Sequence, residues 1–192
     1  MSVVKTYNII KDILNDKPID TKIVENTMEY IISVLDSWLD SVEFDKEFDA
    51  LVWLLKDDYK FSGKLYRGIT LLKDDTSVYN RINYDFPQSF TTNKEIAIKF
   101  AQNDKVTVDG AVNEDRDPSE TIHVMMEVDI IQSGVNLFEF CKDLSEICDV
   151  LLDEDIADDF KQTLSYAIEE EEVLILPYMF SDCNESIKVY SI

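Results

Sequence analysis

The sequence predicts an α+β fold in a single domain, residues 1–192, with a helical front over residues 1–60 and a β core over residues 61–192. Two patterns indicate this fold. Apolar residues recur at helical spacing in the first third of the chain, and from Lys64 onward several segments alternate between apolar and polar residues. A chain of 192 residues with 45% hydrophobic residues can also bury a substantial core.

The helical front is expected to contain a long helix that begins after a cap at Asp20 or Thr21. The apolar positions that follow share one helical face, and a second set continues the pattern as far as Leu55. These positions are Ile23, Val24, Met28, Ile31, Ile32, Leu35 and Leu39, then Phe48, Leu51, Val52 and Leu55.

The β core is predicted from short segments of β character. They are "KLYRGI" (Lys64–Ile69), "TIHVMMEVDI" (Thr121–Ile130), "EVLIL" (Glu172–Leu176) and "SIKVYSI" (Ser186–Ile192). In the second segment Ile122, Val124, Met126, Val128 and Ile130 share a face.

Helices and a loop are expected between these strands. The stretch Thr91–Ala101 predicts a helix with Thr92 and Glu95 at capping-box spacing and with Ile96, Ala97 and Phe100 facing inward. Residues Cys141–Ile168 predict one or two more helices, and Asn103–Glu120 predicts a long mobile loop.

The charge of the chain limits its partners. Forty acidic residues against 18 lysines and arginines give a formal net charge of -22, so the surface repels nucleic acid and anionic membranes. The charge serves either solubility or the attraction of basic partners, and composition does not choose between them. The odd number of cysteines (Cys141, Cys148, Cys183) predicts free thiols, and the early charges argue against a signal peptide. We therefore expect a soluble intracellular protein that is a monomer.

Several chemistries are disfavoured. None of the four glycines forms GxGxxG or a P-loop, so no backbone cradle for phosphates is expected. The sole histidine, His123, lies on the polar face of a predicted strand, and a lone imidazole there favours a surface role over metal binding or a Ser-His-Asp triad.

Three segments in a fixed order carry the remaining chemistry. Arg67 lies within an apolar strand, where its guanidinium needs an anion, supplied either by an internal salt bridge or by a ligand. Hydroxyls at Ser89 and Thr91 alternate on a strand that runs into the predicted helix. Four consecutive glutamates, Glu169–Glu172, then lead directly into an apolar strand.

These segments make the sequence resemble the arginine-serine-glutamate class of mono-ADP-ribosyltransferases, a group with clostridial toxin, animal cell-surface and small phage members. The resemblance rests on "LYRG", on "SFT" with the later Phe100-Ala101, and on "EEEVLILP", and it spans about Lys64 to the C-terminus. It implies an ADP-ribosyltransferase-like mixed β-sandwich with an N-terminal helical layer.

The resemblance also implies roles for individual residues. Glu172 would stabilise the positive charge that develops when the nicotinamide–ribose bond of NAD breaks, and Ser89 would orient it. Arg67 would clamp the NAD phosphates, Gly68 would meet the nicotinamide amide through its backbone, and Thr91 would be the second hydroxyl of the NAD site.

The resemblance also suggests which residues contact the arginine acceptor and the nicotinamide ring. Glu170 would assist an arginine nucleophile, because the first glutamate of Glu-x-Glu marks arginine-modifying members of the class. Glu169 and Glu171 would be solvated neighbours. Phe100 would either stack on the nicotinamide or pack in the core.

Two functions follow. The first is an enzyme that uses NAD as substrate, without a metal, and modifies arginine on a basic protein, with NAD hydrolysis as a side reaction. The second is a catalytically idle acidic protein that sequesters a basic partner. An enzyme requires Arg67, Ser89 and Glu172 to converge on one cleft, whereas a decoy requires only charge.

Overall fold

A computed structural model describes residues 2–39, 46–73, 88–102, 106–108, 111–113, 121–176 and 188–192. It confirms a mixture of helices and antiparallel strand pairs, as expected for an α+β fold. The chain divides into two compact units. One contains residues 1–60 and 135–169, and the other contains residues 61–134 and 170–192.

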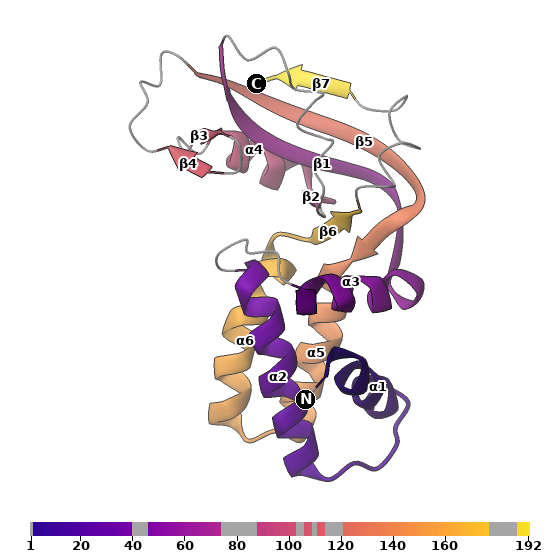
Figure 1. Ribbon diagram of the computed structural model, residues 1–192. Helices are drawn as coiled ribbons and strands as arrows, with labels where there is room; N and C mark the ends of the chain where they lie inside the picture. The colour runs from indigo at the N-terminus through magenta and orange to yellow at the C-terminus, as the bar shows by residue number, and fades with distance from the viewer. Residues whose placement is uncertain are drawn as a thin grey trace. The chain divides into compact units, whose positions relative to one another are not determined.

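The first unit is helical. Its helices, coloured indigo to purple and orange in Figure 1, are α1 (Val3–Leu14), α2 (Thr21–Leu39), α3 (Lys46–Asp58), α5 (Leu137–Leu151) and α6 (Glu154–Glu169). Helix α5 packs along α6, α2 packs against both, and α1 packs against α3. The partition differs from the predicted one, because residues 135–169 join the helical front instead of the β core. The apolar faces of α5 and α6 pack against α2, a neighbour that lies about 100 residues earlier in the sequence.

Helix caps and a pair of stacked rings stabilise the helical unit. Asp20 caps α2, since its carboxylate accepts a 2.9 Å hydrogen bond from the backbone N–H of Lys22. Asn136 caps α5 through a 3.2 Å bond from the N–H of Glu139. The rings of Trp38 and Phe48 stack with centroids 4.8 Å apart and join α2 to α3.

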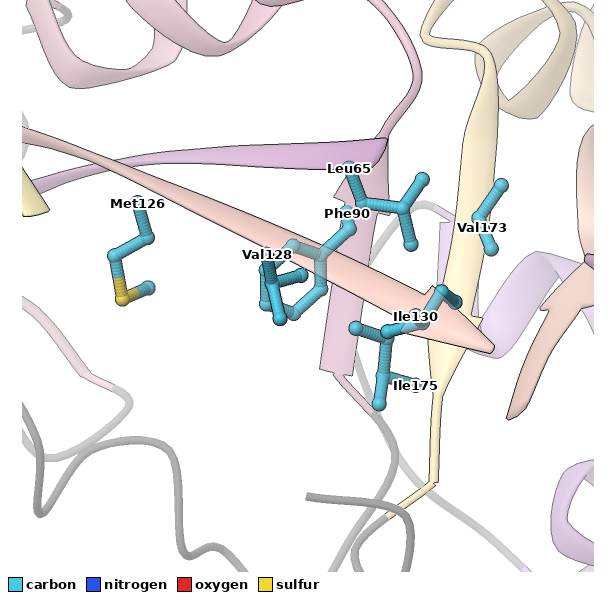
Figure 2. Close-up of a cluster of buried hydrophobic side chains, with 7 residues drawn as sticks. All are labelled: Leu65, Phe90, Met126, Val128, Ile130, Val173 and Ile175. Atoms are coloured by element: carbon cyan, nitrogen blue, oxygen red, sulfur yellow. The ribbon is translucent and has the colours of Figure 1, made fainter. Parts of the chain in front are cut away.

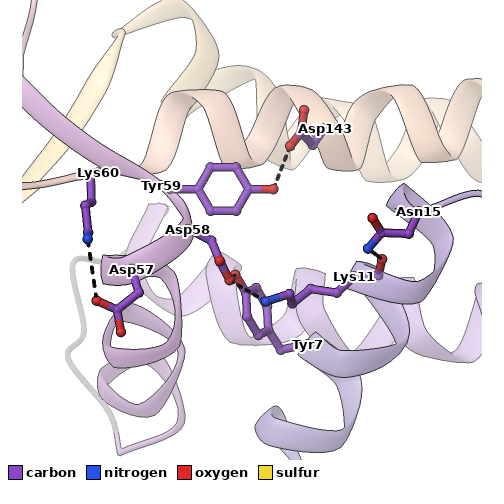
Figure 3. Close-up of polar contacts among 8 residues, drawn as sticks. All are labelled: Tyr7, Lys11, Asn15, Asp57, Asp58, Tyr59, Lys60 and Asp143. Carbon is purple, nitrogen blue, oxygen red and sulfur yellow. Dashed lines mark hydrogen bonds and ion pairs between the residues drawn. The ribbon is translucent and has the colours of Figure 1, made fainter.

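A polar network ties three of these helices together (Figure 3). The Tyr7 hydroxyl donates a 2.7 Å hydrogen bond to Asp58, which also accepts a 2.8 Å bond from the Lys11 ammonium. The Tyr59 hydroxyl donates a 2.6 Å bond to Asp143 on α5. Burial, and next the bonds to these carboxylates, raise the pKa values of both tyrosines well above their usual range.

The second unit is built on a five-stranded sheet with the order β1-β2-β6-β5-β7 and a further pairing of β1 with β5. Figure 1 shows β1 and β5 as two long curved strands. The strands are β1 (Lys60–Leu72), β2 (Gln88–Thr91), β5 (Thr121–Asn136), β6 (Glu172–Ile175) and β7 (Lys188–Ser191), and helix α4 (Lys94–Gln102) follows β2.

One face of this sheet carries a cluster of buried apolar side chains (Figure 2). Its members come from β1, β2, β5 and β6, so the cluster holds the three motif-bearing strands to the long strand β5. They are Leu65, Phe90, Met126, Val128, Ile130, Val173 and Ile175. Of the five β5 residues predicted to share a face, Met126, Val128 and Ile130 lie in this cluster, Val124 is also buried, and Ile122 is half-buried. We call this side of the sheet the core face.

Helix α4 packs on the opposite side, which we call the helix face. A Cβ atom added at Gly68 would lie 1.7 Å from the carbonyl oxygen of Ala97, so the helix backbone touches the strand directly. The Thr70 hydroxyl, two residues farther along β1, donates a 2.9 Å bond to the carbonyl oxygen of Ala101. Successive side chains of a strand point to opposite faces, so Gly68 and Thr70 lie on the helix face while Leu65 lies on the core face.

Three local expectations were wrong. Asn93, not Thr92, caps α4, because its side-chain oxygen accepts a 3.0 Å bond from the N–H of Glu95. The segment Asn103–Glu120 was expected to be a loop, yet it contains the antiparallel pair β3 (Val106–Val108) and β4 (Ala111–Asn113). His123 is half-buried, with its Nδ1 3.3 Å from the Thr70 hydroxyl, and is therefore not a simple surface residue.

Candidate active site

The three motif-bearing segments lie on three neighbouring strands. Arg67 is on β1, Ser89 and Thr91 are on β2, and Glu172 begins β6, and the sheet order places these strands side by side. The segments are far apart in sequence, so only the antiparallel pairings of β2 with β1 and with β6 bring them together.

Glu172 and Thr91 face each other across the β2–β6 pair. They are register partners, and directly opposed residues in an antiparallel pair point to the same face. Since Val173 and Ile175 lie on the core face, Glu172 must point to the helix face. Its side chain is only 3% exposed, and Thr91 is 4% exposed. The Thr91 hydroxyl accepts a 3.0 Å bond from the N–H of Asn93, which uses an oxygen lone pair and not its hydrogen.

Ser89 shares this face but stands one step away. Its register partner is Leu174, so Glu172 is its diagonal neighbour, a relationship in which backbones lie about 7–8 Å apart. The structure therefore brings Ser89, Thr91 and Glu172 together. It gives Thr91, rather than Ser89, the position directly opposite the carboxylate. Sequence alone could not distinguish the two hydroxyls, because the choice depends on the register of β6.

Arg67 lies on the other face of the sheet. It is two residues from Leu65 on β1, and its guanidinium donates a 2.8 Å hydrogen bond to the side-chain oxygen of Gln88. Its Cζ also lies 5.8 Å from the centroid of the Phe90 ring, which belongs to the core face. Arg67 therefore lies on the core face and Ser89 and Glu172 on the helix face, and the expected convergence of the three on one cleft stays a prediction. Helix α4 packs against Gly68 on the helix face, so the alternation of side chains along β1 assigns the neighbouring Arg67 to the core face.

Gly68 has a packing role that the sequence did not suggest. The absence of a side chain there admits the backbone of α4, whose Ala97 and Ala101 are both fully buried. A contact between the Gly68 backbone and a nicotinamide amide was expected. The structure accounts for this glycine by helix packing.

Phe100 and Glu170 do not occupy the positions expected of them. Phe100 is 43% exposed, so the expectation that it faces the core was wrong, and Ala101 takes the inward position. Glu170 lies in the turn before β6, and Glu171 has a φ of 48°. The chain is therefore not extended from Glu170 to Glu172, so alternation along a strand does not place these two side chains on the same side.

Glu171 is the functional candidate that sequence reasoning missed. It was expected to be a solvated neighbour, yet its carboxylate accepts hydrogen bonds from the Thr92 hydroxyl and, at 3.4 Å, from the Asn93 side-chain amide. Its carbonyl oxygen also accepts a bond from the N–H of Thr92. A left-handed conformation in a residue with a side chain costs about 1–2 kcal/mol, so these bonds must hold the turn in place. The pair Thr92-Asn93, directly after the hydroxyl strand, was the available signal.

Two of the three cysteines lie on helix α5. Cys141 and Cys148 are buried thiols that form no disulfide, as predicted, and burial raises the pKa of Cys148 to about 11. No cluster of three or more His, Cys, Asp or Glu side chains among the described residues is placed to hold a metal ion. None of the described helices is long and apolar enough to cross a membrane. Cys183, Arg81 and Arg116 lie outside the described residues.

Comparison of the chain with known protein families, with curated proteins and with solved structures finds no match.

Proposed function

We propose that this chain is a mono-ADP-ribosyltransferase with an ADP-ribosyltransferase-like fold, which cleaves NAD at the nicotinamide–ribose bond and transfers ADP-ribose to arginine on a basic protein. NAD hydrolysis is the side reaction when water replaces the acceptor. The observation that carries the proposal is the position of Glu172, a buried carboxylate directly opposite Thr91 and diagonal to Ser89 on adjacent strands.

This arrangement suits a reaction that develops positive charge. Breaking the bond between the ribose C1′ and the nicotinamide nitrogen sends the electron pair to nicotinamide and leaves an oxocarbenium-like sugar. A carboxylate shielded from water interacts strongly with that charge, and neighbouring hydroxyls can hold its orientation before reaction. The nitrogen of the acceptor arginine then bonds to C1′ and loses a proton to a base, for which Glu170 is the candidate.

The burial of Glu172 has a consequence for substrate entry. Since its side chain is only 3% exposed, NAD must displace the groups that cover it before the ribose can reach the carboxylate. The same burial excludes water from the carboxylate before NAD binds. We therefore expect NAD binding to be coupled to a movement of the groups that cover Glu172.

The decisive experiment compares two charge-matched variants. Glu172→Gln should retain the fold but lose on the order of 100-fold or more in the rate of nicotinamide release, because it removes charge stabilisation from the transition state. Glu169→Gln removes the same charge at the exposed end of α6 and should act like the wild type. The purified chain, NAD labelled in its adenylate moiety and a cell lysate suffice for the assay. A wild-type chain that neither releases nicotinamide nor transfers label would refute the enzyme.

A second function is favoured by a different observation. The Arg67 guanidinium donates its hydrogen bond to Gln88 on the core face, whereas Glu172 points to the helix face. In addition, exposed carboxylates gather at the start of α6 and just before it, although Asp158 is paired with Lys161; they are Asp153, Glu154, Asp155, Asp158 and Asp159. Both features suit an acidic protein that binds a basic partner and catalyses no reaction on it.

Salt and product analysis separate the two functions. An enzyme leaves ADP-ribose covalently attached to arginines of basic proteins, and its rate of transfer falls as salt screens the long-range attraction over about 10 Å at 0.1 M. A decoy captures the same basic proteins in a salt-sensitive way and leaves them unmodified. Mass spectrometry of lysate proteins, and of Arg81 and Arg116 of the chain itself, distinguishes these outcomes.

A further inference from the structure

The strand that presents Glu172 has an ambiguous sequence. Its apolar residues Val173, Leu174, Ile175 and Leu176 are all buried and do not alternate with polar residues. Strand register is specified by alternation, because a slip of one residue turns every side chain to the other face. An uninterrupted apolar run has no such preference, so it would be buried in either of two registers.

The glutamates that precede the strand do not resolve the ambiguity. In the observed register Thr91 stands opposite Glu172. If β6 slipped by one residue so that Glu171 stood opposite Thr91, a glutamate would still occupy that position. Hydrophobic pattern and charge pattern therefore both leave the register open, and contacts outside the strand pair must decide it.

The turn before β6 supplies such contacts. The Glu171 carboxylate accepts hydrogen bonds from the Thr92 hydroxyl and the Asn93 side-chain amide, and the backbone carbonyl of Glu171 accepts the N–H of Thr92. Asn93 is itself fixed, since its side-chain oxygen caps α4 through the N–H of Glu95 and its own N–H binds Thr91. Helix α4 is seated on Gly68 by direct backbone contact.

We propose that Glu171 is a positioning residue that fixes the register of β6 on β2 and so selects Glu172, out of four consecutive glutamates, to stand opposite Thr91. A residue held by Thr92 and Asn93 cannot also stand opposite Thr91, and its left-handed φ of 48° ends the turn so that the extended chain begins at Glu172. The catalytic significance of this role depends on the proposed function, whereas the register itself does not.

The test uses two variants and one control. Glu171→Gln keeps the shape of the side chain but leaves one acceptor oxygen, so that an amide group opposes one of the two donors. Thr92→Val removes the hydroxyl from the other side of the same contact at nearly constant volume. Glu169→Gln removes the same charge from an exposed position and serves as the matched control.

The first readout does not depend on catalysis. Amide hydrogen exchange of residues 172–175 should become at least about 10-fold faster in Glu171→Gln and in Thr92→Val, because the strand pair opens or shifts more readily without the contact. The cross-strand nuclear Overhauser effects between Thr91 and Glu172 should weaken in both variants. The double variant should show little further change, since both substitutions break one interaction.

The second readout is kinetic. In both variants kcat for NAD cleavage should fall on the order of 10- to 100-fold while KM for NAD changes little, because a misplaced carboxylate affects the transition state more than binding. Unchanged exchange and unchanged Thr91–Glu172 contacts in both variants would overturn the role of Glu171. A wild-type chain without NAD cleavage would refute the proposed enzyme only, and the exchange measurements would still decide whether Glu171 fixes the register. If Glu171→Gln fails to fold, Thr92→Val carries the test.

Discussion

The Arg67 guanidinium donates a 2.8 Å hydrogen bond to the side-chain oxygen of Gln88, a residue that is only 2% exposed. This contact joins β1 to β2 on the core face, whereas Glu172 points to the helix face. Arg67 therefore contributes to the site first by holding the hydroxyl strand, and its expected contact with the NAD phosphates is a separate question.

Substitutions at the two partners answer that question. Gln88→Leu should lower the free energy of unfolding by about 1–3 kcal/mol, because the half-buried guanidinium loses an acceptor. Arg67→Met should lower it by less, since the apolar stem is kept while the charge is removed, and should leave KM for NAD within about threefold of the wild type. Urea unfolding and steady-state kinetics measure the two effects. A large rise in KM at unchanged stability would instead establish the phosphate contact.

Replacing Gly68 tests how α4 is seated. A Cβ atom there would lie 1.7 Å from the Ala97 carbonyl oxygen and 2.6 Å from the Ala101 backbone nitrogen, and helix backbone cannot move aside as a flexible side chain can. Gly68→Ala should therefore lower the free energy of unfolding by about 1–3 kcal/mol or more. Ser62→Ala, at an exposed position of the same strand, is the control. Equal denaturation midpoints for the two variants would show that the close packing of α4 is absent in solution.

Glu170 separates transfer from hydrolysis. Glu170→Gln should reduce transfer of ADP-ribose to arginine by more than it reduces NAD hydrolysis, because water needs no help to become positioned or deprotonated as a guanidinium does. The ratio of labelled protein to free ADP-ribose measures this difference. If both activities fell together, Glu170 would act through the turn that precedes β6 and not on the acceptor.

The tyrosines of the helical unit predict a loss of stability in alkaline solution. Burial and the bonds to Asp58 and Asp143 raise the pKa values of Tyr7 and Tyr59 in the folded state. The unfolded tyrosines therefore release protons first, so their contribution is complete below about pH 10 and declines as the pH rises above it. Urea unfolding from pH 8 to pH 11 should show a steeper decline for the wild type than for a Tyr7→Phe, Tyr59→Phe variant.

At pH 8 the same substitutions report on the hydrogen bonds. Tyr59→Phe should lower the free energy of unfolding by about 0.5–1.5 kcal/mol, since Asp143 loses the 2.6 Å bond from the hydroxyl. Tyr190→Phe, an exposed position on β7, is a suitable control. Parallel pH profiles for the wild type and the double variant would contradict the raised pKa values.

The sequence by itself determined most of the helices and strands, although the segment that contains β3 and β4 was expected to be a loop. The 3.6-residue period before Leu55 and the alternation from Val124 to Ile130 are local properties, because they follow from the burial of one face of each element. The cap at Asp20 and the hydroxyl strand from Ser89 to Thr91 were readable for the same reason. The order of the motifs that carry the proposed chemistry was also readable from the sequence.

Tertiary structure decided what those elements do together. The run Val173–Leu176 contains no alternation, so the sequence could not say that Glu172 stands opposite Thr91, nor that Glu171 binds Thr92 and Asn93. The face on which Arg67 lies depends on the packing of α4 against Gly68, because neighbouring residues of a strand point to opposite faces. Pairing and register join residues more than 20 positions apart, and they are set by packing between elements, which no local pattern in the chain encodes.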